Sequence, residues 1–355
     1  MEMIPCLPDE IARECLIRVP YRGFSTVSAV CRGWKEEIES LQFQQQRKAS
    51  GLTRPIVVLT QAHFTGNSGG ATKYSIPPSY RLTVYEPVTG IWAELPPVPG
   101  FSDGLPLFCQ VAGVGLKLVV VGGWNPENWA VSKAVLVYDF VSATWHRGAD
   151  MPGVPRSFFA CASDSDRMVF VAGGHDDGKN ALRSAMVYDV AKDEWVPLPD
   201  MAQQRDECKG IFHAGKFHVI GGYRTDMQGR FEKSAEAFDV STWQWNQVQE
   251  DMLEAGTCPR TCVADDVGKI YRCWNGQVAV LEESGSWKAV AELPSDVRVG
   301  PCLVTWQGKL LVIGSATHGG FHMSYVLDLH CYKWTRVEAP EEYTGHAQAG
   351  CCLEI

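Results

Sequence analysis

The chain has 355 residues, of which 45% are hydrophobic, and it carries a formal net charge of −9. This charge argues against a nucleic-acid backbone as a partner, and no run of about 18 apolar residues is present that could span a membrane. The N-terminus lacks a charged-then-apolar signal segment, so the thirteen cysteines are expected to be free thiols and the protein to reside in the cytoplasm, the nucleus or both.

Residues 7–38 show helical periodicity in two segments. Pro8 followed by Asp9 and Glu10 predicts a helix start. The apolar positions of this first segment share one face, which consists of Ile11, Ala12, Cys15, Leu16 and Val19. The second segment, expected to be capped by Ser25 or Thr26, carries an apolar stripe of Val27, Val30, Cys31, Trp34 and Ile38. So few residues cannot bury this surface alone, so the surplus must face the rest of the chain or a partner.

These helical residues resemble an F-box over residues 4–45, in particular Leu7-Pro8, Phe24 and Val30-Cys31-Arg32. An F-box is a helical module that docks on the Skp adaptor of an SCF (Skp–cullin–F-box) ubiquitin ligase. We therefore expect an F-box domain over residues 1–46. The adaptor contacts that the resemblance implies are Leu7, Pro8, Ile11, Cys15, Leu16, Val19, Val27, Val30, Cys31 and Trp34.

The remaining chain repeats one phrase six times, with a tryptophan seven positions after a bulky apolar residue. The pairs are Tyr85–Trp92, Tyr138–Trp145, Tyr188–Trp195, Phe238–Trp245, Val280–Trp287 and Leu327–Trp334. Within a copy, a small-residue strand precedes a β-rich run ending in paired glycines such as Gly173-Gly174, and the third run ends in a phrase such as Tyr188-Asp189. Four short strands per copy are typical of a propeller blade. The tryptophans are expected to lie between neighbouring blades.

Paired glycines, Tyr-Asp and Trp at this spacing resemble the kelch repeat, which implies a mainly β fold with a six-bladed kelch propeller over residues 47–355. The first copy begins at Pro55 with a second strand that has no first strand before it. The C-terminal residues 345–353 form a first strand with no blade after it. We expect these two strands to pair, so that the C-terminal strand closes the ring.

A helical F-box directly before a kelch propeller resembles the plant F-box/kelch-repeat family. Residues 1–5, 45–50 and 348–351 are similar to one plant subgroup, whose members target phenylalanine ammonia-lyase or type-B response regulators for degradation. The resemblance implies a non-catalytic substrate-recognition subunit of an SCF-type ligase, with the Skp adaptor and cullin scaffold as partners. It also implies a target that is ubiquitinated and degraded by the proteasome, in phenylpropanoid biosynthesis or cytokinin signalling.

Two sets of connections are expected to emerge on one mouth of the propeller, and they carry the candidate target contacts. Loops after the second strands supply aromatic and polar side chains, whereas segments leading into the first strands supply one arginine in each of four blades. The predicted contacts are Trp124, Trp129, Arg156, His175, Arg205, Tyr223, Arg224, Arg260 and Arg298. The arginine fork suits a carboxylate. In the alternative, the arginines bond neighbouring backbone carbonyls and hold the blades together. The glycine-rich segment 61–79 is expected to be mobile.

A different class of function is a kelch enzyme or an iron-dependent specifier whose N-terminal helices are a purely structural cap. Glu338, Glu342 and His346 have the spacing of the iron ligands in plant nitrile specifiers, but Pro340 and Gly345 interrupt the segment. No Ser-His-Asp phrase stands out in sequence order. The cysteines that recur in the first strands favour small buried thiols over metal ligands; they are Cys109, Cys161, Cys208, Cys262 and Cys302. We therefore predict no catalytic residue, metal or cofactor.

Overall fold

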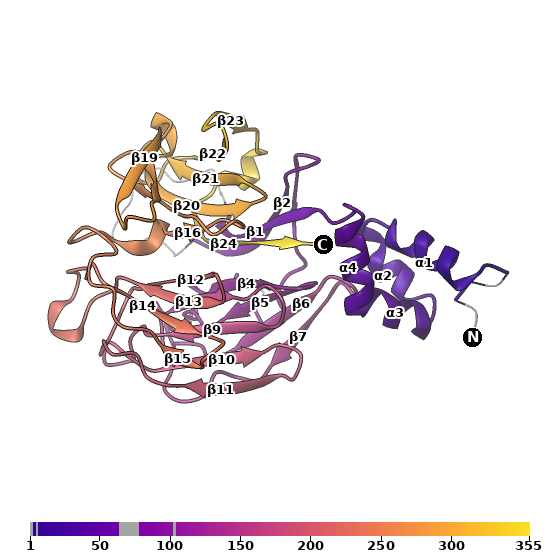
Figure 1. The fold of residues 1–355 in the computed structure, drawn as a ribbon, viewed down its shortest axis with the longest axis horizontal. Helices are drawn as coiled ribbons and strands as arrows, with labels where there is room; N and C mark the ends of the chain where they lie inside the picture. Colours follow the sequence, from indigo (N-terminus) through magenta and orange to yellow (C-terminus); the bar gives the residue numbers. More distant parts are fainter. Residues whose placement is uncertain (1–2, 5, 64–77, 102–103) are drawn as a thin grey trace.

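The computed structural model describes residues 3–4, 6–63, 78–101 and 104–355. In this part of the chain, four α-helices precede six four-stranded antiparallel sheets, which pack as blades around a common axis (Figure 1). The predicted mainly β fold with six blades is confirmed. No helix of these residues is long and apolar enough to cross a membrane. The predicted mobile loop 61–79 lies mostly outside the described residues.

The strands of each blade are given from the channel outward. Blade 1 consists of β24 (Ala347–Glu354), β1 (Pro55–Ala62), β2 (Tyr80–Glu86) and β3 (Ile91–Glu94). Blade 2 consists of β4 (Gln110–Val114), β5 (Lys117–Val121), β6 (Val135–Asp139) and β7 (Thr144–Gly148), and blade 3 of β8 (Ala160–Ser163), β9 (Met168–Ala172), β10 (Ala185–Asp189) and β11 (Glu194–Leu198). Blade 4 consists of β12 (Lys209–His213), β13 (Lys216–Ile220), β14 (Ala235–Asp239) and β15 (Gln244–Trp245). Blade 5 consists of β16 (Val263–Ala264), β17 (Ile270–Trp274), β18 (Gln277–Leu281) and β19 (Trp287–Glu292), and blade 6 of β20 (Val299–Trp306), β21 (Lys309–Ser315), β22 (His322–Asp328) and β23 (Trp334–Val337).

The C-terminal strand closes the ring as predicted. β24 pairs with β1 from Pro55 opposite Glu354 to Gln61 opposite Ala347, and so supplies the inner strand of the first blade. It also packs against the inner strands of both neighbouring blades, β20 and β4. Beyond the strand, the backbone of Ile355 exchanges two hydrogen bonds with Arg54, at 2.7 and 2.9 Å. The ring therefore has no gap between its first and last blades.

The six repeated tryptophans join neighbouring blades, as predicted. Each donates its indole N–H to a backbone carbonyl of the preceding blade over 2.6–3.1 Å. The acceptors for Trp92, Trp145, Trp195, Trp245, Trp287 and Trp334 are Glu338, Pro96, Ala149, Pro199, Met252 and Glu292, respectively. The bond from Trp92 to Glu338 links the first blade to the sixth, so the tryptophans also contribute to ring closure.

In blade 5, the tryptophan does not lie opposite the residue seven positions before it. Trp287 lies opposite Leu281, not Val280, because the turn between their strands is shorter than in the other blades. The Glu282 N–H bonds the Ser286 carbonyl at 2.9 Å, which leaves three residues in the turn. In the other five blades, the tryptophan lies opposite the residue seven positions before it.

The N-terminal helices are α1 (Asp9–Ile17), α2 (Phe24–Ser28), α3 (Arg32–Glu39) and α4 (Leu41–Ala49). Pro8 precedes α1 as predicted. The predicted cap at Ser25 or Thr26 is wrong, because α2 begins at Phe24 and has no side-chain cap. Ser40 instead caps α4, where its hydroxyl accepts the Phe43 N–H at 3.1 Å. Helix α4 also runs through the predicted boundary at residue 46.

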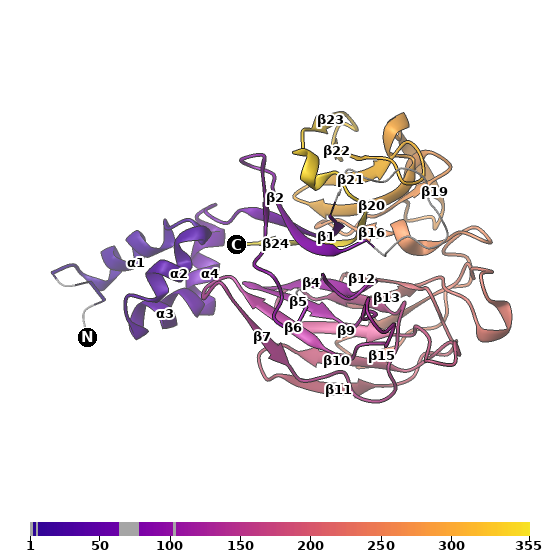
Figure 2. The same ribbon diagram turned by 180° about the vertical axis from the view of Figure 1, so that it is seen from behind.

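The helices pack on the end of the propeller where blades 1 and 2 make their hairpin turns (Figures 1 and 2). Their buried side chains form one hydrophobic cluster with both blades; it contains Leu16, Ile17, Phe24, Ile38, Phe43, Ile56, Leu116, Phe140, Val141 and Leu353. The Arg22 guanidinium pairs with Glu86 at 2.7 Å, and Tyr21 also donates to this carboxylate. The Ser28 hydroxyl bonds the Val141 carbonyl at 3.2 Å. A shared core and polar contacts therefore fix the helices to the ring.

Candidate functional site

The two predicted sets of connections do meet on one mouth of the propeller, at the end opposite the helices. In blades 2, 3 and 4, the residue after the glycine pair forms an isolated β-bridge with the segment leading into the inner strand. The bridges are Leu107–Trp124, Ser157–His175 and Asp206–Tyr223. Glycine is required beneath them: a Cβ at Gly174, where φ is +80°, would lie 2.3 Å from the Ser157 carbonyl oxygen.

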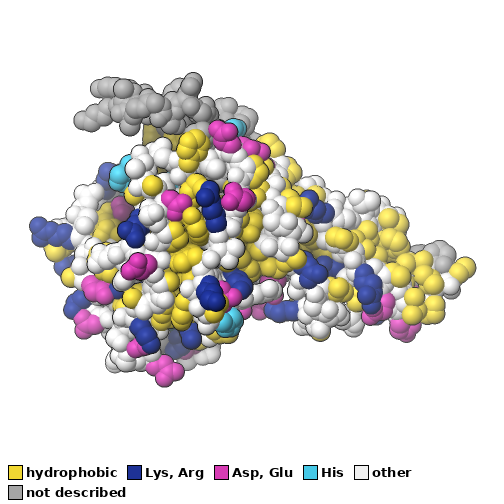
Figure 3. All heavy atoms as spheres, turned by 90° about the horizontal axis from the view of Figure 1, so that it is seen from above, with side chains coloured by type: hydrophobic (Ala, Val, Ile, Leu, Met, Phe, Trp, Pro, Cys, Tyr) yellow, Lys and Arg dark blue, Asp and Glu magenta, His cyan; other side chains and the backbone are white. Residues whose placement is uncertain are grey.

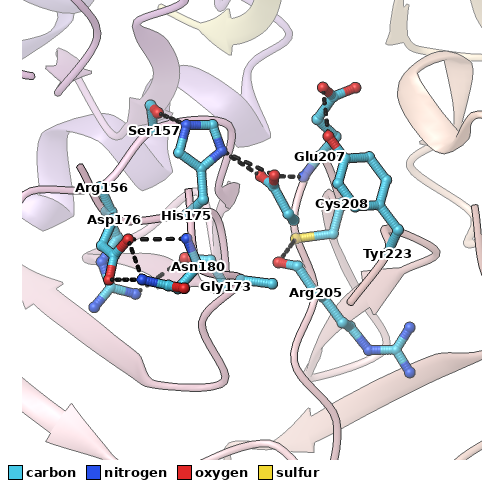
Figure 4. Close-up of polar contacts among 12 residues, drawn as sticks. Arg156, Ser157, Gly173, His175, Asp176, Asn180, Arg205, Glu207, Cys208 and Tyr223 are labelled. Atoms are coloured by element: carbon cyan, nitrogen blue, oxygen red, sulfur yellow. Dashed lines mark hydrogen bonds and ion pairs between the residues drawn. The ribbon is translucent and has the colours of Figure 1, made fainter. Parts of the chain in front are cut away.

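At the blade 3 bridge, a serine, a histidine and an aspartate form a hydrogen-bonded chain. Ser157 and His175 point toward one another (Figure 4), with 2.8 Å between the Ser157 Oγ and the His175 Nε2. The His175 Nδ1 lies 2.8 Å from both carboxylate oxygens of Asp206, which belongs to the next blade. An anionic acceptor on Nδ1 favours the tautomer with its proton there, so Nε2 accepts from the serine.

This arrangement has the order of a nucleophile, base and orienting acid. Ser157 is only 1% exposed, however, and His175 and Asp206 are buried too. The equivalent bridge in blade 2 is formed by Leu107 and Trp124, which cannot support such chemistry. The chain of hydrogen bonds therefore holds blade 3 to blade 4, and as the structure stands it leaves no room for a substrate at the hydroxyl.

Arg156 and Arg205 fill the structural role that was the alternative for the arginine set. Arg205 is completely buried and donates to the carbonyls of Gly221 and Ser234 at 2.8 and 3.0 Å. Arg156 is also buried and donates to the carbonyls of Gly173 and Ser184. Burial lowers the pKa of Arg156 to about 10. Neither side chain can contact a target directly, because both guanidinium groups lie inside the blades.

The other three predicted arginines are exposed, and two of them contact carboxylates or a backbone carbonyl. Arg224 lies 3.6 Å from a Glu232 oxygen and 3.9 Å from one of Asp226. Arg298 donates to the Leu293 carbonyl at 3.4 Å. Arg260, in a short 3₁₀ turn, forms no ion pair with any residue in the described ranges. Arg260 is therefore the predicted arginine best placed to meet an external anion.

An aromatic cluster occupies the mouth over blades 2 and 3. Trp124 and Trp129 meet edge to face at 6.0 Å, and Trp129 is 52% exposed, as expected of a contact anchor. Phe158 stacks on His175 at 5.5 Å and lies edge to face with Trp124. Tyr223 is buried and donates to Glu207 at 2.9 Å, while burial raises its pKa. Tyr223 and His175 therefore support the mouth from below, and Trp129 presents an exposed face.

Sequence reasoning missed a pocket of about 490 Å³ at the mouth, between blades 5, 6 and 1. Its polar lining includes Tyr80, Arg260, His322 and His346. The sequence places His346 among the three candidate iron ligands and near the start of the closing strand. In the structure it contacts Tyr80 and Arg260, whereas Glu338 pairs with Arg336. No group of three His, Cys, Asp or Glu side chains that could hold a metal exists among the described residues.

All thirteen cysteines are free thiols, as predicted. Those of the first strands are mostly buried, and burial raises the pKa of Cys109, Cys161 and Cys262 to about 12. Such thiols are unreactive near neutral pH.

The helical end presents the predicted adaptor face only in part. Exposed apolar side chains gather there in Figure 3. Leu7, Pro8, Ile11, Cys15, Val30 and Cys31 are exposed, whereas Val19, Val27 and Trp34 are half-buried. Leu16 is 2% exposed and lies in the core shared with the propeller, so its predicted direct contact with an adaptor is not available. Trp34 donates its indole N–H to the Met3 carbonyl at 2.6 Å.

Comparison with known proteins matches both parts of the chain. Residues 4–45 match the F-box domain, and residues 107–152 and 155–202, which contain blades 2 and 3, match the Kelch motif. Two Arabidopsis thaliana proteins, F-box/kelch-repeat protein At1g80440 and F-box/kelch-repeat protein At1g15670, are 48% and 49% identical over the full length of both chains. F-box/kelch-repeat protein SKIP20 of the same plant is 30% identical over 97% of this chain and 94% of its own.

Proposed function

Since the chain belongs to the F-box/kelch-repeat proteins, we propose that it is the substrate-recognition subunit of an SCF-type ubiquitin ligase. In this role it performs no chemistry itself. It holds a target protein near the conjugating enzyme, so that ubiquitin transfer becomes a reaction between neighbours. The observation that carries the proposal is the placement of an exposed apolar face on the helices at the end opposite the mouth of the ring.

The adaptor-binding role is supported by apolar side chains that nothing in the described structure covers. Ile11, on α1, is 49% exposed, and Val30, in the turn between α2 and α3, is 59% exposed. Exposed apolar groups that cluster on one module are typical of a docking surface. The Skp adaptor would cover this face, and the cullin scaffold would follow through the adaptor.

Co-purification with a Skp adaptor tests the face directly. Ile11→Glu and Val30→Glu each place a charge on it and are expected to weaken adaptor binding by about 2–4 kcal/mol, as for a central interface residue. Val267→Glu, at a 75% exposed position of blade 5, is the matched control. Leu16→Ala would be a poor test, because it opens a cavity in the shared core. Adaptor binding retained by both glutamate variants would refute the assignment of this face.

The target is proposed to bind across the mouth. The exposed Trp129 offers apolar area on one side of the ring, and Arg260 offers a positive charge on the side of blades 5, 6 and 1. Phenylalanine ammonia-lyase and type-B response regulators are the candidate targets, and the cytoplasm, the nucleus or both are the proposed location. Capture of either protein by the purified chain would be compared between wild type and Trp129→Ala. Capture of neither would exclude both candidates.

A hydrolase that acts on acyl groups is a second candidate, favoured only by the Ser157–His175–Asp206 geometry. Opening of the mouth would have to expose the Ser157 hydroxyl, which is buried. A fluorophosphonate probe labels activated serines, so labelling of the purified chain that disappears in Ser157→Ala would support catalysis. Absence of labelling, with adaptor binding intact, would leave the receptor function alone.

A further inference from the structure

The pocket between blades 5, 6 and 1 brings together side chains from four separate segments. Tyr80 begins β2, Arg260 lies in the 3₁₀ turn before β16, His322 begins β22, and His346 directly precedes β24. The walls include Gly300, Gly319 and Gly320, which expose backbone to the cavity. Closing the ring with β24 thus also builds this pocket, because it brings His346 beside Tyr80.

The polar lining has a defined donor and acceptor order. Arginine can only donate, so the His346 Nε2, 3.4 Å from an Arg260 guanidinium nitrogen, must accept. The proton of His346 is then on Nδ1, which lies 2.9 Å from the Tyr80 hydroxyl and donates to it. Arg260 is exposed, and apart from His346 no described residue is joined to its side chain by a hydrogen bond or an ion pair.

A second histidine in the pocket has a hydrogen-bonding atom without a partner. His322 is 6% exposed and meets His346 edge to face at 5.2 Å. Its Nδ1 is buried and bonds no atom of the described residues. A buried polar group left unpaired destabilises the fold. A ligand that reaches the pocket floor and offers an oxygen or N–H would satisfy it.

The electrostatics of the pocket select the charge of that ligand. Burial, and after it the nearby Arg260, lowers the pKa of both His322 and His346 to about 4, so both imidazoles are neutral at pH 7. No carboxylate is among the groups that act on either ring. Among the described residues that line the cavity, Arg260 is therefore the single Lys or Arg side chain, in a chain of net charge −9. One fixed charge with neutral hydrogen-bonding groups matches a monoanion better than a phosphate dianion.

We infer that this pocket receives one carboxylate side chain from an acidic segment of the target, with Arg260 and His322 as its direct partners. The inference rests on the proposed target-binding role of the mouth. Blade 5 leaves a path for the segment, because Asn275 and Gly276 alone connect its second and third strands. The exposed ring of Trp274 lies at the end of β17, where it can contact residues beside the acid.

Immobilised peptide pools test the inference on the full chain in complex with its adaptor. Each pool is a degenerate dodecapeptide with one fixed central residue: Asp, Glu, Asn, Gln, Lys or phosphoserine. The wild-type chain is expected to prefer the Asp or Glu pools over their amides. Arg260→Gln removes one charged partner, so that preference should fall roughly tenfold to a hundredfold. Arg298→Gln is the control, because this arginine is also exposed but bonds the Leu293 carbonyl.

The outcomes separate this inference from the proposed function. An acidic preference that is lost in Arg260→Gln and in His322→Phe, but kept in Arg298→Gln, supports the pocket. Equal binding of acid and amide pools, or a preference that survives Arg260→Gln, overturns it while adaptor binding still stands. Selection of phosphoserine over Asp and Glu would also overturn it, in favour of a phosphopeptide site. A chain that does not retain the adaptor would instead count against the proposed function.

Discussion

Replacement of Arg205 by methionine should destabilise the whole ring without removing any surface group. The Arg205 guanidinium donates to the Gly221 carbonyl, to the carbonyl and hydroxyl of Ser234 at 3.0 and 2.9 Å, and to Glu236 at 3.1 Å. Both members of the Arg205–Glu236 ion pair are completely buried. Methionine fills a similar volume but leaves the Glu236 carboxylate without its counter-charge.

The expected cost follows from that uncompensated charge. In the variant, Glu236 keeps only the backbone N–H donors of Ala202 and Gln203, at 2.6 and 3.2 Å. Removing one partner of a buried ion pair costs about 3–5 kcal/mol, a large part of the roughly 5–15 kcal/mol by which folded proteins are stable. At about 2–4 °C per kcal/mol, the unfolding midpoint should fall by about 6–20 °C.

Arg156 provides a matched comparison within the same fold. It bonds the carbonyls of Gly173 and Ser184 and the Ser184 hydroxyl, as Arg205 does in the next blade, but it has no carboxylate partner. Arg156→Met should therefore cost less, about 1–3 kcal/mol. The difference between the two variants measures the ion pair, and Arg205→Met combined with Glu236→Gln should recover part of the loss.

Thermal unfolding followed by tryptophan fluorescence, together with adaptor and target capture, is the assay. Arg205→Glu is expected to lose both binding activities together with its fold. Equal midpoints for Arg205→Met and Arg156→Met would show that the Arg205–Glu236 ion pair does not stabilise the ring. Loss of target capture alone in Arg205→Glu, at an unchanged midpoint, would show that Arg205 has a direct role in binding.

Three further predictions concern closure and the pocket. Deletion of residues 346–355 removes the inner strand of blade 1 and should abolish cooperative unfolding of the ring; an unchanged melting midpoint would contradict closure by β24. Gly345→Ala should lower the midpoint, because its Cβ would lie 1.9 Å from the Ala62 carbonyl oxygen, whereas Gly33→Ala, with nothing nearer than 3.9 Å, should not. Stability should also fall as the pH drops from 6.5 to 4, because burial, and then Arg260, lowers the folded-state pKa of His322 to about 4 and the unfolded chain then binds more protons. This residue contributes up to about 3 kcal/mol of the loss, and an identical pH dependence of the unfolding free energy in His322→Gln would count against it.

The architecture could be predicted from sequence because a repeat multiplies a weak signal. One tyrosine-to-tryptophan spacing is weak evidence for a fold, but six such spacings predict propeller blades. The first and last copies are incomplete, which predicts that their strands pair with each other. The repeat does not predict local turn length: in blade 5, the hydrogen bond between Glu282 and Ser286 closes a shorter turn and shifts the partner of Trp287. Helix α4 was not predicted, because its glutamine-rich sequence shows little separation of apolar and polar residues.

The site was harder to predict, because side-chain direction depends on one-residue shifts. Arg205 lies three residues before the buried Cys208, whereas Arg260 lies two before the buried Cys262. Arg205 directly precedes the bridging residue Asp206, whereas Arg260 lies in a 3₁₀ turn, so the same residue type is structural in one blade and faces the mouth in another. His322 and His346 come from distant segments that no motif connects. Leu107, Ser157 and Asp206 occupy equivalent positions in blades 2, 3 and 4. A comparison of these positions along the sequence would have indicated the serine–histidine–aspartate chain.

Because the closing strand stands at the end of the chain, blade 1 is completed only late in synthesis. β1 emerges from the ribosome early, yet its inner neighbour β24 is synthesised after every other strand of the ring. Until then, blade 1 lacks its inner strand, and the edge of β1 along the channel stays open to chaperones or to other nascent chains. The pocket between blades 5, 6 and 1 also gains His346 only when this C-terminal segment has been synthesised. Target capture is therefore available only to chains that have been translated through β24, whereas the helices that precede the ring are complete near the start of synthesis.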